Sequence, residues 1–168
     1  MTELNQDNNF TDTWNIWYHH TKDIWTIDGY KSIYSMSNGM DFWKLYNNWK
    51  CIGGISSKHF FIMKNDIMPI WEDITNINGG CWSFKIDESM AEELWEDLSV
   101  LLVTNELIEG CEAVGLSISV KKNNNCVIKI WNKNSMNHSI KHINKNILKK
   151  WKTDIIYIAH MPDNKITI

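Results

Sequence analysis

Apolar and polar residues alternate in several short stretches of the chain, which are separated by Asn, Gly and Asp residues. An alternation with a period of two is typical of strands that bury one face. It predicts strands over residues 14–20, 30–36, 59–64, 81–86 and 154–160, and a hairpin over 113–121 and 126–132. In the hairpin, we expect Val114, Leu116 and Ile118 on the core face, and Lys121, Lys129 and Trp131 on the opposite face.

Three other stretches repeat their apolar residues at helical spacing, over residues 41–49, 89–103 and 136–151. Ser89 and Glu92 form a capping-box pattern that predicts where the second helix begins. Strands and helices do not alternate as they do in parallel βαβ folds. The pattern therefore predicts an α+β fold, with an antiparallel sheet, helices on one face and a free second face for binding.

Trp43 follows Phe42 on the first predicted helix, so it lies about 100° away from the apolar stripe. This position predicts an indole that faces solvent and docks a partner helix or peptide. Partial burial under a neighbouring loop is the alternative.

The composition is that of one soluble domain of 168 residues with 43% apolar residues and 10 tryptophans. Residues 1–12 are polar and aperiodic, so we expect a flexible tail there and a single domain over 13–168. The net charge of -3 argues against nonspecific coating of nucleic acid. Four cysteines without a CxxC pair, and no signal peptide or long apolar run, predict no zinc site, no membrane association and a cytoplasmic or nuclear location.

The segment from Pro69 to Trp82 combines a tryptophan and a carboxylate, Trp71 and Glu72, with a Gly-Gly pair. An indole offers a stacking face for a base, and a carboxylate accepts hydrogen bonds from the donors on a guanine edge. This favours a purine-binding loop. The alternative is a core tryptophan beside a solvated glutamate.

Motifs for catalysis are lacking. His138 and His142 share a helix face without the glutamate of a zinc-protease motif, and there is no nucleophile elbow, P-loop or dinucleotide fingerprint. We therefore expect a binding protein without enzymatic activity, metal or cofactor.

Several motifs occur together in one order: Trp14-x-x-Trp17, Trp25, Phe42-Trp43-x-Leu45-Tyr46-Asn47, Pro69-x-Trp71-Glu72-Asp73, Gly79-Gly80-x-Trp82 and Ile130-Trp131. In this combination the chain resembles the eukaryotic translation initiation factor 4E family over about residues 14–160. The resemblance implies a curved antiparallel sheet with three helices on its convex face. The ligand, the 7-methylguanosine cap of mRNA, would bind on the concave face.

The resemblance also assigns roles by position. Trp25 and Trp71 would stack on the base, Glu72 would bind its edge, and Trp131 would contact the methyl group. Lys121 stands where the family has a phosphate-binding arginine, and Lys122 and Lys129 are further candidates for the phosphates. Trp43 matches the tryptophan that docks a scaffold partner of the initiation factor 4G type.

The chain departs from the family pattern at several positions. Cys81 and Val127 stand where the family usually has basic residues, and Glu96 stands where it usually has leucine. We therefore expect a divergent member that acts in translation initiation. The alternative is a module that represses or sequesters capped RNA, or that prefers another modified 5′ end.

Overall fold

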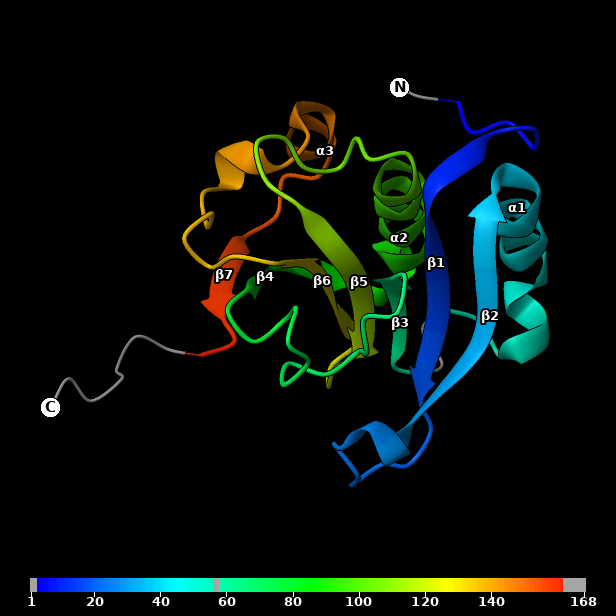
Figure 1. Ribbon diagram of the computed structural model, residues 1–168, viewed down its shortest axis with the longest axis horizontal. Coiled ribbons are helices and arrows are strands. Elements are labelled where there is room, and N and C mark those ends of the chain that lie inside the picture. Colours follow the sequence, from blue (N-terminus) through cyan, green and yellow to red (C-terminus); the bar gives the residue numbers. More distant parts are fainter. Residues whose placement is uncertain (1–2, 56–57, 162–168) are drawn as a thin grey trace, which may run out of the picture.

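The strands of the protein form one antiparallel sheet, whose order differs from the order along the chain (Figure 1). The computed structural model describes residues 3–55 and 58–161. Within these residues, seven strands pair in the order β2-β1-β3-β5-β6-β4-β7. Their bounds are β1 Asn9–His19, β2 Tyr30–Asn38, β3 Phe60–Lys64, β4 Gly80–Asp87, β5 Ala113–Val120, β6 Asn125–Asn132 and β7 Ile155–Ala159.

Three α-helices cover one face of this sheet: α1 Gly39–Asn48, α2 Glu88–Val103 and α3 Lys145–Lys150. Alternate strand residues pack against them in one large core, and the helices add Phe42, Leu94, Leu98 and Ile147 to it. The predicted α+β fold, with helices on one face of a curved antiparallel sheet, is confirmed. None of the helices within the described ranges is both long enough and apolar enough to span a bilayer.

Side-chain caps fix where the first two helices begin. The Asn38 side chain accepts a hydrogen bond from the Asp41 amide at the start of α1. At the start of α2, the Asp87 carboxylate accepts from both the amide and the hydroxyl of Ser89. The N-cap is therefore Asp87, and the prediction of a cap at Ser89 is wrong by two residues.

The predicted third helix over residues 136–151 is wrong in its length. Only a 3₁₀ turn, Ile140–His142, and the short α3 are helical there. Ile143 is extended and forms an isolated bridge with Ile108, and the Asn144 side chain then caps α3. Because Ser and Asn side chains compete for backbone hydrogen bonds, they divide a stretch that has the apolar spacing of one helix.

A bulge in β5 alters the prediction for the hairpin. Between Ala113 and Gly115, strand β5 advances two residues while β6 advances one. Leu116 and Ile118 face the helices as expected, but Val114 packs with Phe61 and Trp131 on the opposite side. An extra residue in one strand shifts the inward and outward alternation, and strand periodicity cannot reveal it.

The predicted tail over residues 1–12 is longer than the structure allows. Strand β1 already begins at Asn9, and Leu4 is 7% exposed within the core. Residues 1 and 2 lie outside the described residues.

Candidate functional site

The sheet face opposite the helices carries a hollow of about 390 Å³. Its walls combine aromatic rings with charged side chains of both signs, from the loops after β1 and β3 and from strands β2 to β7 or the residues beside them. The lining residues are Trp25, Tyr30, His59, Phe61, Pro69, Ile70, Trp71, Glu72, Cys81, Ser117, Ser119, Lys121, Lys129, Trp131, Ile158 and His160. All but one of the sequence-predicted binding residues for the base and phosphates line this hollow.

The loop between β3 and β4 is held by two buried polar side chains. The Asp73 carboxylate accepts hydrogen bonds from the amides of Met68 and Thr75. The fully buried Asn76 amide donates to the carbonyls of Met68 and Ile70, at 2.9 and 2.8 Å. These bonds replace the sheet ladder that an irregular segment lacks, so the loop has a defined shape.

This shape leaves Trp71 and Glu72 pointing outward. The Trp71 side chain is 46% exposed and Glu72 is exposed, and both border the hollow. The alternative of a core tryptophan is therefore wrong. In the motif of this loop, Asp73 organises the backbone, while the two residues before it, Trp71 and Glu72, border the hollow.

Trp25, on the loop after β1, is 59% exposed and is supported from one side by His19. The two rings are stacked with centroids 4.3 Å apart and an angle of 24° between their planes. His19 Nε2 lies 2.6 Å from the Ile24 carbonyl, which can only accept, so Nε2 carries the proton. His19 thereby fixes both the loop and the indole that the loop presents.

Trp131 forms the floor of the hollow. Its indole Nε1–H donates to the Ser117 hydroxyl at 3.0 Å, and its ring meets Phe61 edge-on at 6.1 Å. Trp131 does face away from the helices, but it is only 7% exposed because it packs in a small second core with Phe61 and Cys81.

His160, at the end of β7, joins three parts of the site. Its Nδ1 lies 2.8 Å from the Asn76 carbonyl and its Nε2 3.2 Å from the Cys81 sulfur. The carbonyl can only accept, so Nδ1 holds the proton and Nε2 accepts from the Cys81 thiol. Its ring also lies 4.9 Å from that of Trp131, centroid to centroid. Burial raises the pKa of Cys81 to about 12, so this thiol stays protonated.

The two histidines that line the hollow, His59 and His160, are uncharged at neutral pH. Burial, followed by the charges of His19, Lys121 and Lys129, lowers the pKa of His59 to about 3. Burial also lowers the pKa of His160. Burial and the nearby Glu72 charge raise the pKa of Tyr30, which also lines the hollow, to about 12. The negative charge in the hollow therefore comes from Glu72 and the positive charge from lysines.

Two of the three candidate phosphate ligands lie at the site. Lys129 lines the hollow from β6, and Lys121 lines it from the start of the hairpin turn. Lys122 is exposed in that turn and does not line the hollow. Asn123 and Asn124 in this turn both have left-handed backbones, with φ of 65° and 58°, as residues of hairpin turns often do.

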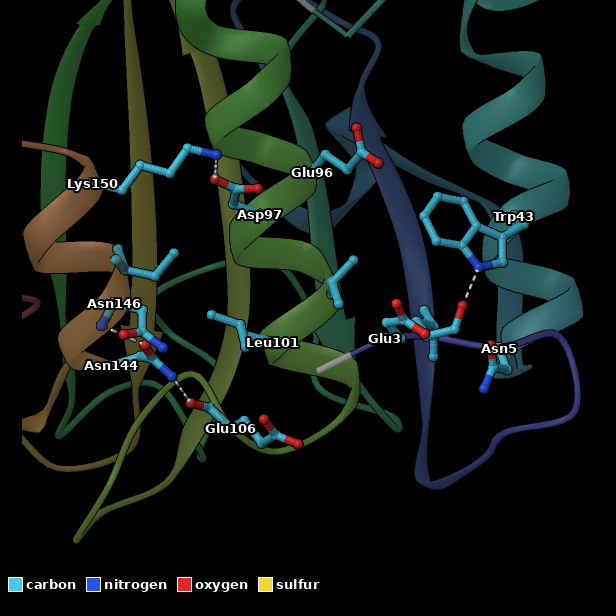
Figure 2. A pocket seen from close by; sticks show the side chains of 13 residues that line it. Glu3, Asn5, Trp43, Glu96, Asp97, Leu101, Glu106, Asn144, Asn146 and Lys150 are labelled. Carbon is cyan, nitrogen blue, oxygen red and sulfur yellow. Dashed lines mark hydrogen bonds and ion pairs between the residues drawn. The ribbon is translucent and has the colours of Figure 1, made fainter. Parts of the chain in front are cut away.

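Trp43 lies on the helical side of the sheet and is half-buried, so the prediction of a solvent-facing indole is wrong. Its Nε1–H donates to the Leu4 carbonyl at 2.7 Å, which places segment 3–8 over part of α1 (Figure 2). Trp43 borders a separate groove between α1, α2 and α3.

Residues 9–166 match the family model described as Eukaryotic initiation factor 4E. The chain belongs to the eukaryotic initiation factor 4E family. This confirms the resemblance carried by the tryptophan motifs.

Relatives in this family come from plants and animals. The chain is 32% identical over 114 residues to initiation factor NCBP of Arabidopsis thaliana, covering 66% of this chain and 50% of the relative. It is 27% identical to initiation factor 4E-1 of Lactuca sativa, covering 86% of this chain and 62% of the relative. The chain thus spans about half the length of the first of these relatives.

Solved structures of the family share the fold. C. elegans eIF4E-3, in complex with the 4E-binding protein Mextli and a cap analog, superposes with a TM-score of 0.78. The sequence identity is 22%, over 91% of this chain and 92% of that one. Ascaris suum eIF4E-3 with an m2,2,7G cap gives a TM-score of 0.76 at 21% identity, with 96% of each chain covered.

Three histidines in or next to the hollow were not predicted from the family motifs. His19, His59 and His160 are far apart in the sequence and carry no motif, yet they support Trp25, Phe61 and Trp131. The one signal in the sequence was their position at or beside the end of a predicted strand, which is too common to single them out.

Proposed function

We propose that the hollow binds the 7-methylguanosine cap of mRNA. One observation carries the proposal: two exposed indoles, Trp25 and Trp71, border the same hollow as a carboxylate, Glu72, and two lysines. In this assignment the indoles stack on the base and Glu72 accepts from the N1–H and 2-amino groups. Trp131 lies beside the methyl group, and Lys121 and Lys129 lie at the phosphates.

The charges of the hollow suit this ligand. Methylation at N7 makes guanine cationic, so each indole face adds a cation–π attraction of about 0.5–2 kcal/mol to the stacking. His59 and His160 are uncharged because of their lowered pKa values, so they do not repel the base. Adenine offers neither donor to Glu72, which supports selectivity for guanine.

We infer that binding is not followed by chemistry. The Cys81 thiol is protonated, with its pKa raised to about 12, and its hydrogen bond goes to a neutral His160. In the described part of the chain, no group of three or more His, Cys, Asp or Glu residues is arranged to hold a metal ion. Family membership supports a role in translation initiation in the cytoplasm, with a scaffold partner of the initiation factor 4G type docking near Trp43.

A second role is supported by the surface around Trp43. The indole N–H is already bonded to Leu4, and Glu96 stands at a position usually occupied by leucine in the family. Both features disfavour the usual scaffold partner and favour a module that sequesters capped RNA. Pull-down of the purified scaffold factor by the cap-loaded protein distinguishes initiation from sequestration.

Retention on 7-methyl-GTP resin tests cap binding. The wild-type chain should bind and be eluted by free 7-methyl-GTP but not by ATP, and Trp71→Ala should pass through. Ile74→Ala is the matched control, because Ile74 lies on the same loop, is 88% exposed and does not line the hollow. Equal retention of Trp71→Ala and Ile74→Ala would refute the assignment.

A further inference from the structure

Segment 3–8 runs across the first turns of α1 and is fixed there by three hydrogen bonds. The Gly39 and Met40 amides donate to the carbonyls of Asn8 and Gln6, at 2.7 and 3.0 Å. One turn later, the Trp43 indole donates to the Leu4 carbonyl at 2.7 Å. The segment thus satisfies two amides that a helix N-terminus leaves without intrahelical partners.

Two side-chain features make this contact specific. The Leu4 side chain is buried with the main core, at 7% exposure. Gly39 allows the close approach, because a Cβ on it would lie 1.8 Å from the Asn5 carbonyl oxygen. An alanine at position 39 would therefore displace the segment.

The segment borders a groove of about 440 Å³ between α1, α2 and α3 (Figure 2). The rim of this groove is acidic, with Glu3, Glu96, Asp97 and Glu106 among its residues. Asp97 is paired with Lys150 at 2.8 Å, whereas Glu96 has no ion pair within the described ranges. Burial and then the charges of Asp97, Glu92 and Glu93 raise the pKa of Glu96, and together they outweigh the opposing effect of the Lys150 charge.

We propose that segment 3–8 is an internal, displaceable occupant of the docking surface around Trp43. The partner that displaces it is a protein segment with an apolar side chain, which replaces Leu4, flanked by Lys or Arg that pairs with Glu96. This inference rests on the proposed docking role of Trp43, and it adds that the chain regulates access to that surface itself.

The charge of the segment explains why it can be displaced. Glu3 brings negative charge to a rim that is already negative. Attachment to the same chain compensates for this mismatch, because a short linker gives an effective concentration of about millimolar. A basic partner segment gains the attraction that the acidic segment lacks.

Two variants of the full chain release the segment in different ways. Leu4→Asp removes the apolar anchor, and Gly39→Ala introduces the clash with Asn5. Asp7→Asn is the matched control on the same segment, because Asp7 is exposed. Hydrogen exchange of the Trp43 indole N–H, assigned with Trp43→Phe, should be about tenfold faster in both releasing variants and unchanged in the control.

The binding probe is a synthetic amphipathic peptide with one leucine flanked by two arginines, compared with a twin that carries glutamates. If the segment occupies the surface for about 90% of the time, release should tighten binding of the arginine peptide about tenfold. Adding Glu96→Gln to the Leu4→Asp variant should weaken binding of the arginine peptide again. The glutamate twin should bind none of the variants.

Equal peptide affinity in wild-type, Leu4→Asp and Gly39→Ala chains would overturn the inference, and so would equal binding of the two peptides. Binding of 7-methyl-GTP is measured on the same samples. Cap binding that persists while the peptide results fail would overturn only this inference. A loss of cap binding in the wild-type chain would count against the proposed function alone.

Discussion

The His19 imidazole lies against the Trp25 indole, with centroids 4.3 Å apart, while its Nε2–H is bonded to the Ile24 carbonyl. One face of an otherwise exposed indole is therefore supported by protein before any ligand binds. A preorganised ring binds more tightly, because less motion has to be frozen on binding. His19 acts as a positioning residue for Trp25.

Replacing His19 with alanine should weaken cap binding through the mobility of Trp25. An aromatic pair contributes about 0.5–1.5 kcal/mol beyond burial, so the Kd should rise roughly two- to tenfold. His19→Phe keeps the stacking and should recover most of the affinity, although it loses the bond to Ile24. Fluorescence titration measures both, and an alanine variant with wild-type affinity would contradict this role.

Asn76→Ala should destabilise the loop that presents Trp71 and Glu72. The substitution leaves the Met68 and Ile70 carbonyls without their donor, and each unsatisfied buried group costs about 1–3 kcal/mol. We expect a loss of about 2–4 kcal/mol of unfolding free energy in urea, together with weaker cap binding. Asn78→Ala, an exposed position on the same loop, should change neither by more than about 0.5 kcal/mol.

His59 should make the protein less stable in acid. Its pKa is about 3 when folded and 6.5 in the reference state, so below pH 6.5 the unfolded chain binds the extra proton. Stability is therefore lost as the pH falls from 6.5 toward 3, at up to about 1.4 kcal/mol per pH unit.

Urea unfolding at pH 7 and pH 5 tests this effect. The wild-type chain should lose about 2 kcal/mol more than His59→Phe over that interval. Phenylalanine keeps an aromatic ring near Phe61 but cannot titrate. An equal loss in the two proteins would show that His59 does not titrate as described.

Lys129 and Lys122 should contribute unequally to phosphate binding. Lys129→Ala should weaken binding of 7-methyl-GTP about tenfold. The variant loses a hydrogen bond to a charged phosphate, and solvent around the open hollow reduces the strength of that bond. The same substitution should barely affect binding of the 7-methylguanosine nucleoside, which has no phosphates. Lys122→Ala should have little effect on either, because Lys122 does not line the hollow. Added salt should weaken 7-methyl-GTP binding by the wild-type chain more than 7-methyl-GTP binding by the Lys129→Ala variant.

Strand and helix periodicity predicted most of the fold, because one-sided burial imposes it on the sequence. Trp82, Phe84 and Ile86 alternate toward the helices as expected. The errors arose at the Asp87 and Asn144 caps, where local hydrogen bonds override periodicity, and at the bulge near Val114, where the strand register shifts. The two caps bond residues only two positions further along the chain, whereas the bulge depends on the neighbouring strand β6.

The candidate site could be predicted only where its residues belong to motifs. Trp71 and Glu72 are adjacent in the sequence, and strand parity was enough to place Lys129 beside Trp131. His59 and His160 line the hollow and His19 stacks on Trp25. The three come from separate strand ends, so only the fold brings them together. The partial burial of Trp43 under segment 3–8 likewise depends on Gly39. A side chain at this position would clash with the Asn5 carbonyl, which only the fold brings close to it.

The preference for 7-methyl-GTP over GTP tests the central claim most directly, by titration of the intrinsic tryptophan fluorescence. The two nucleotides share the guanine edge that we propose Glu72 contacts and the phosphates that we propose the lysines contact, and they differ in the charge on the base. Cation–π attraction of about 0.5–2 kcal/mol at each of two indoles predicts at least roughly fivefold tighter binding of the methylated form. Equal affinities, or no quenching by either nucleotide, would contradict the assignment of Trp25 and Trp71.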